Sequence, residues 1–271
     1  MCRKVGKSSI SFHDRLTARG AVVGCRFAQA VTDAPAIRIR GRYDIAGHRL
    51  FDGVDLELLA GQWTCLLGRS GVGKTTLLRL IAGLDSGEAF EGNIWVSDDN
   101  PLDGRISYMA QSDLLLPWLT VLENVVLGIR LRKEKPDMRR AMDLIGQVGL
   151  GGYRDEKPNA LSGGMRQRTA LARTLMEERP IALLDEPFSA LDASTRADMQ
   201  DLAARKLKGK TVLIVTHDPA EAVRLGHQIA VLTSHGLRLW QTPSSAPVRD
   251  QHAPETAIFQ AELLSFLRGL R

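Results

Sequence analysis

The feature that most constrains the fold of this chain is a glycine-rich segment between two apolar patterns of different period. Residues 68–75 read Gly-Arg-Ser-Gly-Val-Gly-Lys-Thr and fit G-x-x-x-x-G-K-[ST]. They follow an apolar run at 63–67, which predicts a strand, and precede Leu77, Leu78, Ile81 and Leu84, which are spaced as on one helix face. A strand, a tight loop and a helix in this order are the context that a phosphate-binding loop requires.

The residue types of this loop indicate its chemistry. Glycines let successive backbone N–H groups turn toward a phosphate, and the helix N-terminus adds partial positive charge. We expect Lys74 to reach the β- and γ-phosphates of a nucleotide and Thr75 to place its hydroxyl on Mg²⁺. Nucleotide contacts are predicted for Gly68, Arg69, Ser70, Gly71, Val72, Gly73, Lys74, Thr75 and Thr76. The alternative is a glycine-rich turn before a core helix, but a chance match is rare because glycine averages about 7% of residues.

Two acids end a second predicted strand. The run at 181–184 is entirely apolar, as in strands buried on both faces, and Asp185 and Glu186 follow it. Parallel sheets bind ligands at the carboxyl ends of their strands, and successive side chains point to opposite sides. Asp185 therefore suits the Mg²⁺ shell, and Glu186 suits a base that orients an attacking water. Taken alone, the two acids can equally be a strand end that faces solvent.

A third predicted strand, at 211–216, delivers His217 to the same edge after a helical pattern at 195–207. Lone histidines are commonly structural. His217 lies 32 residues after Asp185, which suits one parallel strand-helix-strand unit. This spacing favours a switch role in contact with the γ-phosphate.

The segment at 159–168, Asn-Ala-Leu-Ser-Gly-Gly-Met-Arg-Gln-Arg, opens another predicted helix, at 166–175. The Ser162 hydroxyl and the N–H groups of Gly163 and Gly164 can form a second anion-binding helix terminus. The alternative is an ordinary serine N-cap with flexible glycines. One chain cannot point both termini at a single phosphate if they lie far apart in the fold.

Together these motifs resemble those of the ATP-binding cassette (ABC) ATPases, from about residue 37 to about residue 240. They occur in the order of that family: the phosphate loop, Gln111, the signature at 161–164, Asp185-Glu186, the loop at 189–192 and His217. The resemblance implies an α/β fold, with a P-loop NTPase core built on a mixed, mainly parallel sheet flanked by helices. It also implies a helical subdomain insertion and a small antiparallel β part.

The resemblance further implies a head-to-tail dimer, in which each ATP lies between one chain's phosphate loop and its partner's Ser162, Gly163 and Gly164. Gln111 is expected to touch Mg²⁺ and the attacking water, and Asp192 to contact the nucleotide. Met165 stands where the family most often has glutamine, which puts only a peripheral contact in doubt.

The resemblance also implies that adenine stacks on an aromatic residue roughly thirty positions before the loop lysine. Tyr43 lies 31 positions before Lys74 and is the first candidate, with Phe51 second. The alternative is that either ring packs near the sheet. The apolar run at 114–121 has two interpretations as well: part of the core, or the lining of a groove for a cytoplasmic helix of a membrane partner.

The motifs suggest three regions. We expect an N-terminal extension at 1–36, which is disordered, an extra element, or upstream of the true start. An ABC ATPase domain is expected at 37–242, with its helical subdomain at about 112–176. A proline-containing linker and one amphipathic helix at 256–270 make up residues 243–271.

Composition agrees with an enzyme of this size. Apolar residues make up 44% of the 271, and no apolar run approaches the ~18 to 20 residues that span a bilayer. The net charge of +5 is modest, and the basic residues at 130–135 and 139–140 favour a solvated helix face over a nucleic-acid patch. Cys2, Cys25 and Cys65 lack metal-ligand spacing and suggest reduced thiols.

Within the family, residues 111–125 most resemble the branch that imports nitrate, aliphatic sulfonates, taurine or pyrimidine precursors of thiamine. This implies an ATP-hydrolysing importer subunit that pairs with itself or a paralogous ATPase, beneath two membrane permease subunits served by a solute-binding protein. Its expected place is the cytoplasmic face of the inner (plasma) membrane, as a peripheral subunit. An exporter or lipid-extraction ATPase uses the same motifs. A soluble ABC protein acting on nucleic acid or ribosomes is disfavoured, since only 88 positions separate Lys74 from Ser162 and no sustained heptads intervene.

Overall fold

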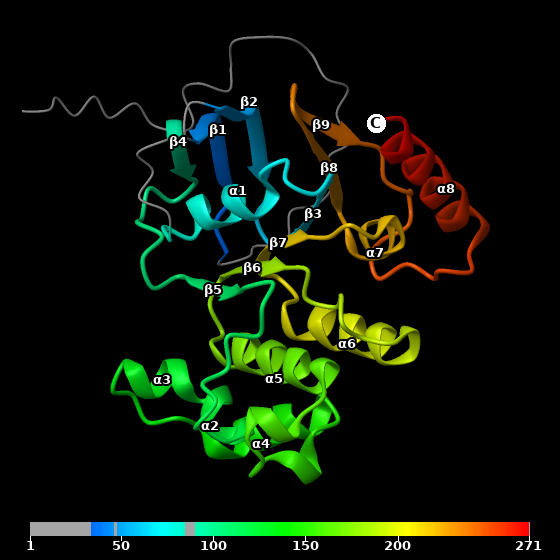
Figure 1. Ribbon diagram of the computed structural model, residues 1–271. Helices are drawn as coiled ribbons and strands as arrows, with labels where there is room; N and C mark the ends of the chain where they lie inside the picture. The colour runs from blue at the N-terminus through cyan, green and yellow to red at the C-terminus, as the bar shows by residue number, and fades with distance from the viewer. Residues whose placement is uncertain (1–33, 46–47, 85–89, 271) are drawn as a thin grey trace, which may run out of the picture. The chain divides into compact units, whose positions relative to one another are not determined.

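The computed structural model describes residues 34–45, 48–84 and 90–270 (Figure 1). Nearly all of the predicted N-terminal extension, with Cys2 and Cys25, lies outside these residues. Cys65 is a free, buried thiol, and burial raises its pKa.

A six-stranded sheet forms the centre of the described fold. Its strands run in the order β5 (Ile106–Met109), β6 (Ile181–Asp185), β7 (Thr211–Val215), β3 (Trp63–Gly68), β8 (Gln228–Thr233) and β9 (Gly236–Trp240). Neighbouring strands from β5 to β8 are parallel, and β9 pairs antiparallel with β8. The strands predicted at 63–67, 181–184 and 211–216 are therefore confirmed.

A separate antiparallel sheet is formed by strands in the order β2 (His48–Leu58), β1 (Ile37–Ile45) and β4 (Phe90–Val96). The predicted α/β class, with a mainly parallel sheet and a small antiparallel part, is confirmed.

Eight α-helices occur among the described residues: α1 (Lys74–Ile81), α2 (Val121–Val125), α3 (Leu127–Leu131), α4 (Met138–Gln147), α5 (Gly163–Met176), α6 (Ala193–Lys206), α7 (Pro219–Leu225) and α8 (Pro254–Gly269). Two 3₁₀ turns, η2 (Gly151–Tyr153) and η3 (Pro158–Ala160), precede α5. Helices α2, α4 and α5 contact one another, in the green part of Figure 1. No helix in the part of the chain that is described is both long and apolar enough to cross a membrane.

The central sheet is buried on both faces, which explains why its strands are almost entirely apolar. Along β6, Leu183 packs with α1 and the antiparallel sheet, whereas Leu184 packs with α5 to α8 on the other face. The same alternation holds along β3 and β7, because successive side chains of a strand point to opposite faces. Two hydrophobic clusters therefore fix the sheet between its covering layers.

The proline-containing segment at 242–254, which was predicted as a linker, connects β9 to α8 without a helix or strand of its own before α8 begins at Pro254. Arg249 is buried, and its guanidinium donates to the carbonyl oxygens of Val223 and Gly226, both at 2.7 Å. It also donates to the carbonyl oxygens of Ser245 at 2.8 Å and Pro243 at 3.3 Å. Buried polar groups must be satisfied, so this arginine anchors the segment against α7. Helix α8 follows, near the range predicted for it.

Leu183→Ala should lower the free energy of unfolding by about 2 to 5 kcal/mol, because it removes a fully buried side chain and leaves a cavity. Urea denaturation without nucleotide measures this loss. The matched control is Leu239→Ala, since Leu239 is 60% exposed and should change stability by less than about 0.5 kcal/mol. Equal losses for the two variants would contradict the two-faced burial of the sheet.

Candidate functional site

The predicted motifs follow the carboxyl ends of four strands that lie side by side. The glycine-rich loop follows β3, Gln111 follows β5, Asp185 and Glu186 end β6, and His217 follows β7. Because these strands are parallel and adjacent, their carboxyl ends meet at one edge of the sheet. This is the edge at which open parallel sheets bind ligands.

The loop at 68–75 is closed around its own lysine. The Lys74 ammonium is buried and donates to the carbonyl oxygens of Gly68 and Arg69, both at 2.9 Å. Burial lowers the pKa of Lys74, against the opposing influence of Glu186 and Asp185. The loop therefore holds a cationic group inside a ring of backbone atoms, an arrangement suited to an anion with several oxygens.

Gly73 is required where the loop enters α1. Its φ of 103° is a left-handed conformation, and a Cβ there would lie 2.8 Å from Cδ1 of Phe51. The buried Phe51 ring thus packs directly against the loop at Gly73. Tyr43 packs against Phe51, with ring centroids 5.8 Å apart, and is only 5% exposed.

The prediction that adenine stacks on Tyr43 is therefore corrected. A base can stack only on an open ring face, and both Tyr43 and Phe51 belong to the buried core. The alternative, that these rings pack near the sheet, describes the structure. Propensity and spacing could not separate the two, because burial of a ring depends on the strands that cover it.

Asp185 is a buried carboxylate at this edge. Neither of its oxygens has a hydrogen bond of acceptable geometry among the described residues, although Thr75 lies close enough to favour the charged form. Burial nevertheless raises the pKa of Asp185, with Glu186 adding to the rise and Lys74 opposing it. A buried carboxylate without partners is costly unless a cation meets it. Thr75 and Asp185 together form a set of oxygen ligands of the kind that Mg²⁺ prefers.

Glu186 follows β6 directly and pairs with His217. Its carboxylate is 3.2 Å from Nδ1 of His217, and its N–H donates to the carbonyl oxygen of Val215 at 2.9 Å. The φ of Glu186 is 49°, a left-handed conformation that costs on the order of 1 kcal/mol for a residue other than glycine. The turn after β6 thus points the acid toward His217, which is largely exposed.

Gln167 holds this strained turn, and sequence reasoning assigned it no role. Its side chain is buried, donates to the carbonyl oxygen of Glu186 at 3.0 Å and to the Ser189 hydroxyl at 3.1 Å, and accepts from the N–H of Ala190 at 2.8 Å. The signal in the sequence that could have indicated this role is a polar residue, Gln167, among the apolar positions of the predicted helix. Gln167 therefore connects α5 to the backbone that positions Glu186.

The serine and glycines that begin α5 lie at an exposed helix N-terminus. Ser162 is the N-cap, and its hydroxyl accepts from the N–H of Met165 at 3.3 Å. Ser162 and Gly163 face solvent. Asp192 also caps a helix, α6, by accepting from the N–H of Thr195 at 3.0 Å, and this backbone bond lowers its pKa.

Helix α5 also holds the loop that follows Gln111. Arg166 donates to the Asp113 carboxylate at 3.0 Å, and Arg173 donates to the carbonyl oxygens of Asp113 at 2.6 Å and Leu114 at 2.8 Å. Gln111 itself is exposed. In the apolar run after it, Leu115 is buried, as the core interpretation predicts, whereas Trp118 is 64% exposed.

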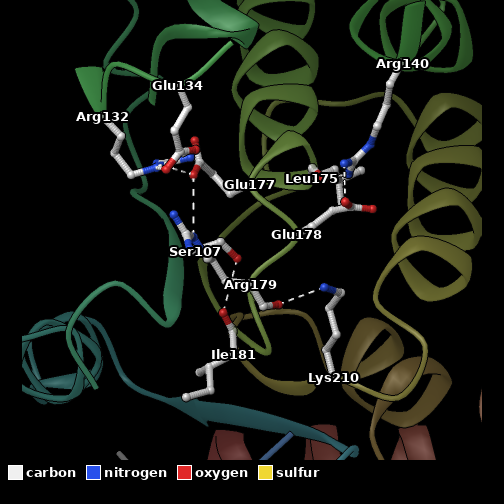
Figure 2. Close-up of polar contacts among 10 residues, drawn as sticks. All are labelled: Ser107, Arg132, Glu134, Arg140, Leu175, Glu177, Glu178, Arg179, Ile181 and Lys210. Carbon is white, nitrogen blue, oxygen red and sulfur yellow. Dashed lines mark hydrogen bonds and ion pairs between the residues drawn. The ribbon is translucent and has the colours of Figure 1, made fainter. Parts of the chain in front are cut away.

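The segment between α5 and β6 is fixed by polar contacts on several sides (Figure 2). Glu177 pairs with Arg132 at 2.7 Å, and Glu178 pairs with Arg140. Lys210 donates to the carbonyl oxygen of Arg179 at 2.8 Å. The helix that begins at Gly163 and the strand that ends at Asp185 are thus joined by a short, anchored connection.

Fold and site together define a nucleotide hydrolase with a phosphate loop. The family model described as "ABC transporter" matches residues 51–189. An "Uncharacterized ABC transporter ATP-binding protein" of Haemophilus influenzae is 43% identical over 232 residues, which cover 82% of this chain and 94% of the relative. An "Aliphatic sulfonates import ATP-binding protein" of Mesorhizobium japonicum is 39% identical over 255 residues, which cover 89% of this chain and 95% of the relative.

Among solved structures, a dimeric ATP-binding cassette in a post-hydrolysis state, bound to ADP and Pi, superposes with a TM-score of 0.66. It is 29% identical, and the match covers 79% of this chain and 99% of that one. The chain belongs to the ABC transporter family, and it is an ATP-binding ATPase of the P-loop fold.

Gln167→Leu should lower kcat for ATP hydrolysis about tenfold or more, because the turn that carries Glu186 loses three hydrogen bonds. Steady-state ATPase assays measure kcat, and urea denaturation measures the accompanying loss of stability. The matched control is Gln200→Leu, since Gln200 is also buried but bonds to Glu221 and Arg224 instead. The prediction is wrong if both variants lose stability but keep the same kcat.

Proposed function

We propose that this chain is the ATP-hydrolysing subunit of a transporter that imports a small solute, of the nitrate, sulfonate, taurine or thiamine-pyrimidine type. The observation that carries the proposal is the meeting of Lys74, Asp185, Glu186 and His217 at one sheet edge. Import is supported by the names of the relatives, several of which are described as aliphatic sulfonates import ATP-binding proteins. Those names favour import over export or lipid extraction.

The residues at this edge suit hydrolysis in stated roles. Lys74 binds the β- and γ-phosphate oxygens, with the backbone of the loop at 68–75 around them. Glu186 orients the attacking water and accepts its proton, and His217 holds the Glu186 carboxylate and senses the γ-phosphate. Thr75, Asp185 and Gln111 would hold Mg²⁺, which neutralises phosphate charge when it is bound. The buried oxygens of Asp185, with Thr75 close to them, support this assignment.

The proposed active unit is a head-to-tail dimer. Ser162 and Gly163 stand exposed at the N-terminus of a 14-residue helix, which presents N–H groups and partial positive charge to an anion. In the proposed dimer, this terminus and Asp192 serve the ATP held by the partner. Helices α2 to α5 would then act as the helical subdomain, at about 112–176, within an ATPase domain at 37–242.

Membrane permease subunits are the proposed partners, so we infer a peripheral position at the cytoplasmic face of the inner membrane. The exposed Leu114 and Trp118 support a docking surface for a helix of the permease, because they stand on the loop that follows Gln111. ATP binding would close the dimer and hydrolysis would reopen it, and the difference in affinity between the two states can drive the permease.

Lys74→Ala should weaken ATP binding at least tenfold, because it removes the ammonium that the phosphates would bind. Calorimetric titration with ATP and Mg²⁺ measures the affinity. Lys208→Ala, which removes an exposed lysine, is the control. Unchanged binding by Lys74→Ala would rule out the loop as the phosphate site.

Glu186→Gln should keep ATP affinity while lowering kcat by about 10²- to 10⁴-fold, because the amide cannot accept the proton of water. With hydrolysis blocked, saturating ATP should hold the chain as a dimer, measured by light scattering. Adding Ser162→Arg should restore the monomer, since its side chain blocks the exposed helix terminus. A Glu186→Gln protein that stays monomeric at saturating ATP would overturn the head-to-tail arrangement.

A further inference from the structure

Helix α8 makes a contact with the phosphate loop that no motif predicts. The guanidinium of Arg69, the second residue of the loop, donates to the carbonyl oxygen of Leu270 at 3.4 Å. The last carbonyls of a helix have no partner within the helix and carry partial negative charge. A guanidinium is therefore a favourable partner for this helix end.

The main chain of Arg69 is already part of the nucleotide site. Its carbonyl oxygen is one of the two that hold the Lys74 ammonium. The same residue thus contacts the site lysine through its backbone and the end of α8 through its side chain. A displacement of residue 69 would change the position of the acceptor that holds Lys74.

The position of α8 is itself fixed by packing. Leu263 is fully buried in the main hydrophobic cluster, and the Phe266 ring lies 4.7 Å from the Trp240 ring. Arg238 belongs to the edge strand β9, and its guanidinium lies 4.8 Å from the centre of the Phe266 ring of α8. Cation–π and ring contacts of this kind add to the stabilisation from apolar burial. The buried Arg249 anchors the segment before the helix.

We propose that α8 is a fixed support for the phosphate loop and that Arg69 is the positioning residue through which it acts. The contact holds residue 69, and with it the acceptors of Lys74, in the conformation that binds phosphates. When a binding loop is already held in its bound conformation, less conformational entropy is lost on binding. Loosening the contact should therefore weaken ATP binding. This inference rests on the proposed role of the loop at 68–75.

A double-mutant cycle between Arg69 and α8 tests the proposal. Arg69→Ala should raise Kd and KM for ATP about two- to fivefold. This is the fold-change that corresponds to losing the favourable interaction of one cation with a helix C-terminus. KM should change more than kcat. In the Phe266→Ala background, which weakens the docking of α8, Arg69→Ala should have no further effect. Arg268→Ala, which removes an exposed arginine from the same helix, should leave ATP binding unchanged.

Equal effects of Arg69→Ala in both backgrounds would mean that its charge acts on ATP directly, and would overturn the proposal. No effect in the wild-type background would overturn it as well. If Phe266→Ala does not fold, a chain ending at Leu267 removes Leu270 while keeping both the buried Leu263 and the Phe266 ring. Lys74→Ala in the same assay separates a failure of the loop assignment from a failure of the role of α8. If Lys74→Ala keeps its ATP affinity, the loop at 68–75 is not the phosphate site. If it loses affinity while the effects of Arg69→Ala and Phe266→Ala are additive, only the proposed role of α8 is wrong.

Discussion

Two ionisable side chains buried at one sheet edge, Lys74 and Asp185, are the constraint on which the rest of the structure depends. Burial lowers the pKa of the lysine and raises that of the aspartic acid, so burial opposes the charged form of each group. The lysine is compensated by two carbonyl oxygens of its own loop. The aspartate has no hydrogen-bond partner of good geometry among the described residues. The apolar clusters on both faces of the sheet hold β6, which ends at Asp185, and α1, which begins at Lys74.

The supports around these charges come from distant parts of the chain. Phe51 lies under Gly73, Gln167 holds the turn at Glu186, and Arg69 connects the loop to α8. Helix α5 has a central place, because it begins with the exposed Ser162 terminus, bonds to the loop after Gln111 and leads into β6. Gln167, which holds the turn at Glu186, lies near the same end of this helix as Ser162.

Local signals predicted much of this site. Strand periodicity located β3, β6 and β7, and the glycine-rich motif located the loop, because both depend on neighbouring residues only. The parallel order of the strands then placed Glu186 beside His217. One expectation from sequence was wrong: Tyr43 is buried rather than open to a base. The anchoring of the segment at 242–254 by Arg249 was not predicted. Both depend on which distant element covers the residue, and no local pattern carries that information.

The sequence by itself determined the family, the chemistry of the phosphate loop and the positions of three strands, because these follow from residue types at short, fixed spacings. Only the tertiary structure decided which side chains support the site. Gln167 is an ordinary helical glutamine until the turn at 186–190 packs against it, and Arg69 is an ordinary loop arginine until the end of α8 comes within 3.4 Å. Contacts between residues 23 and 201 positions apart are set by packing of the whole core, which single-sequence patterns do not encode.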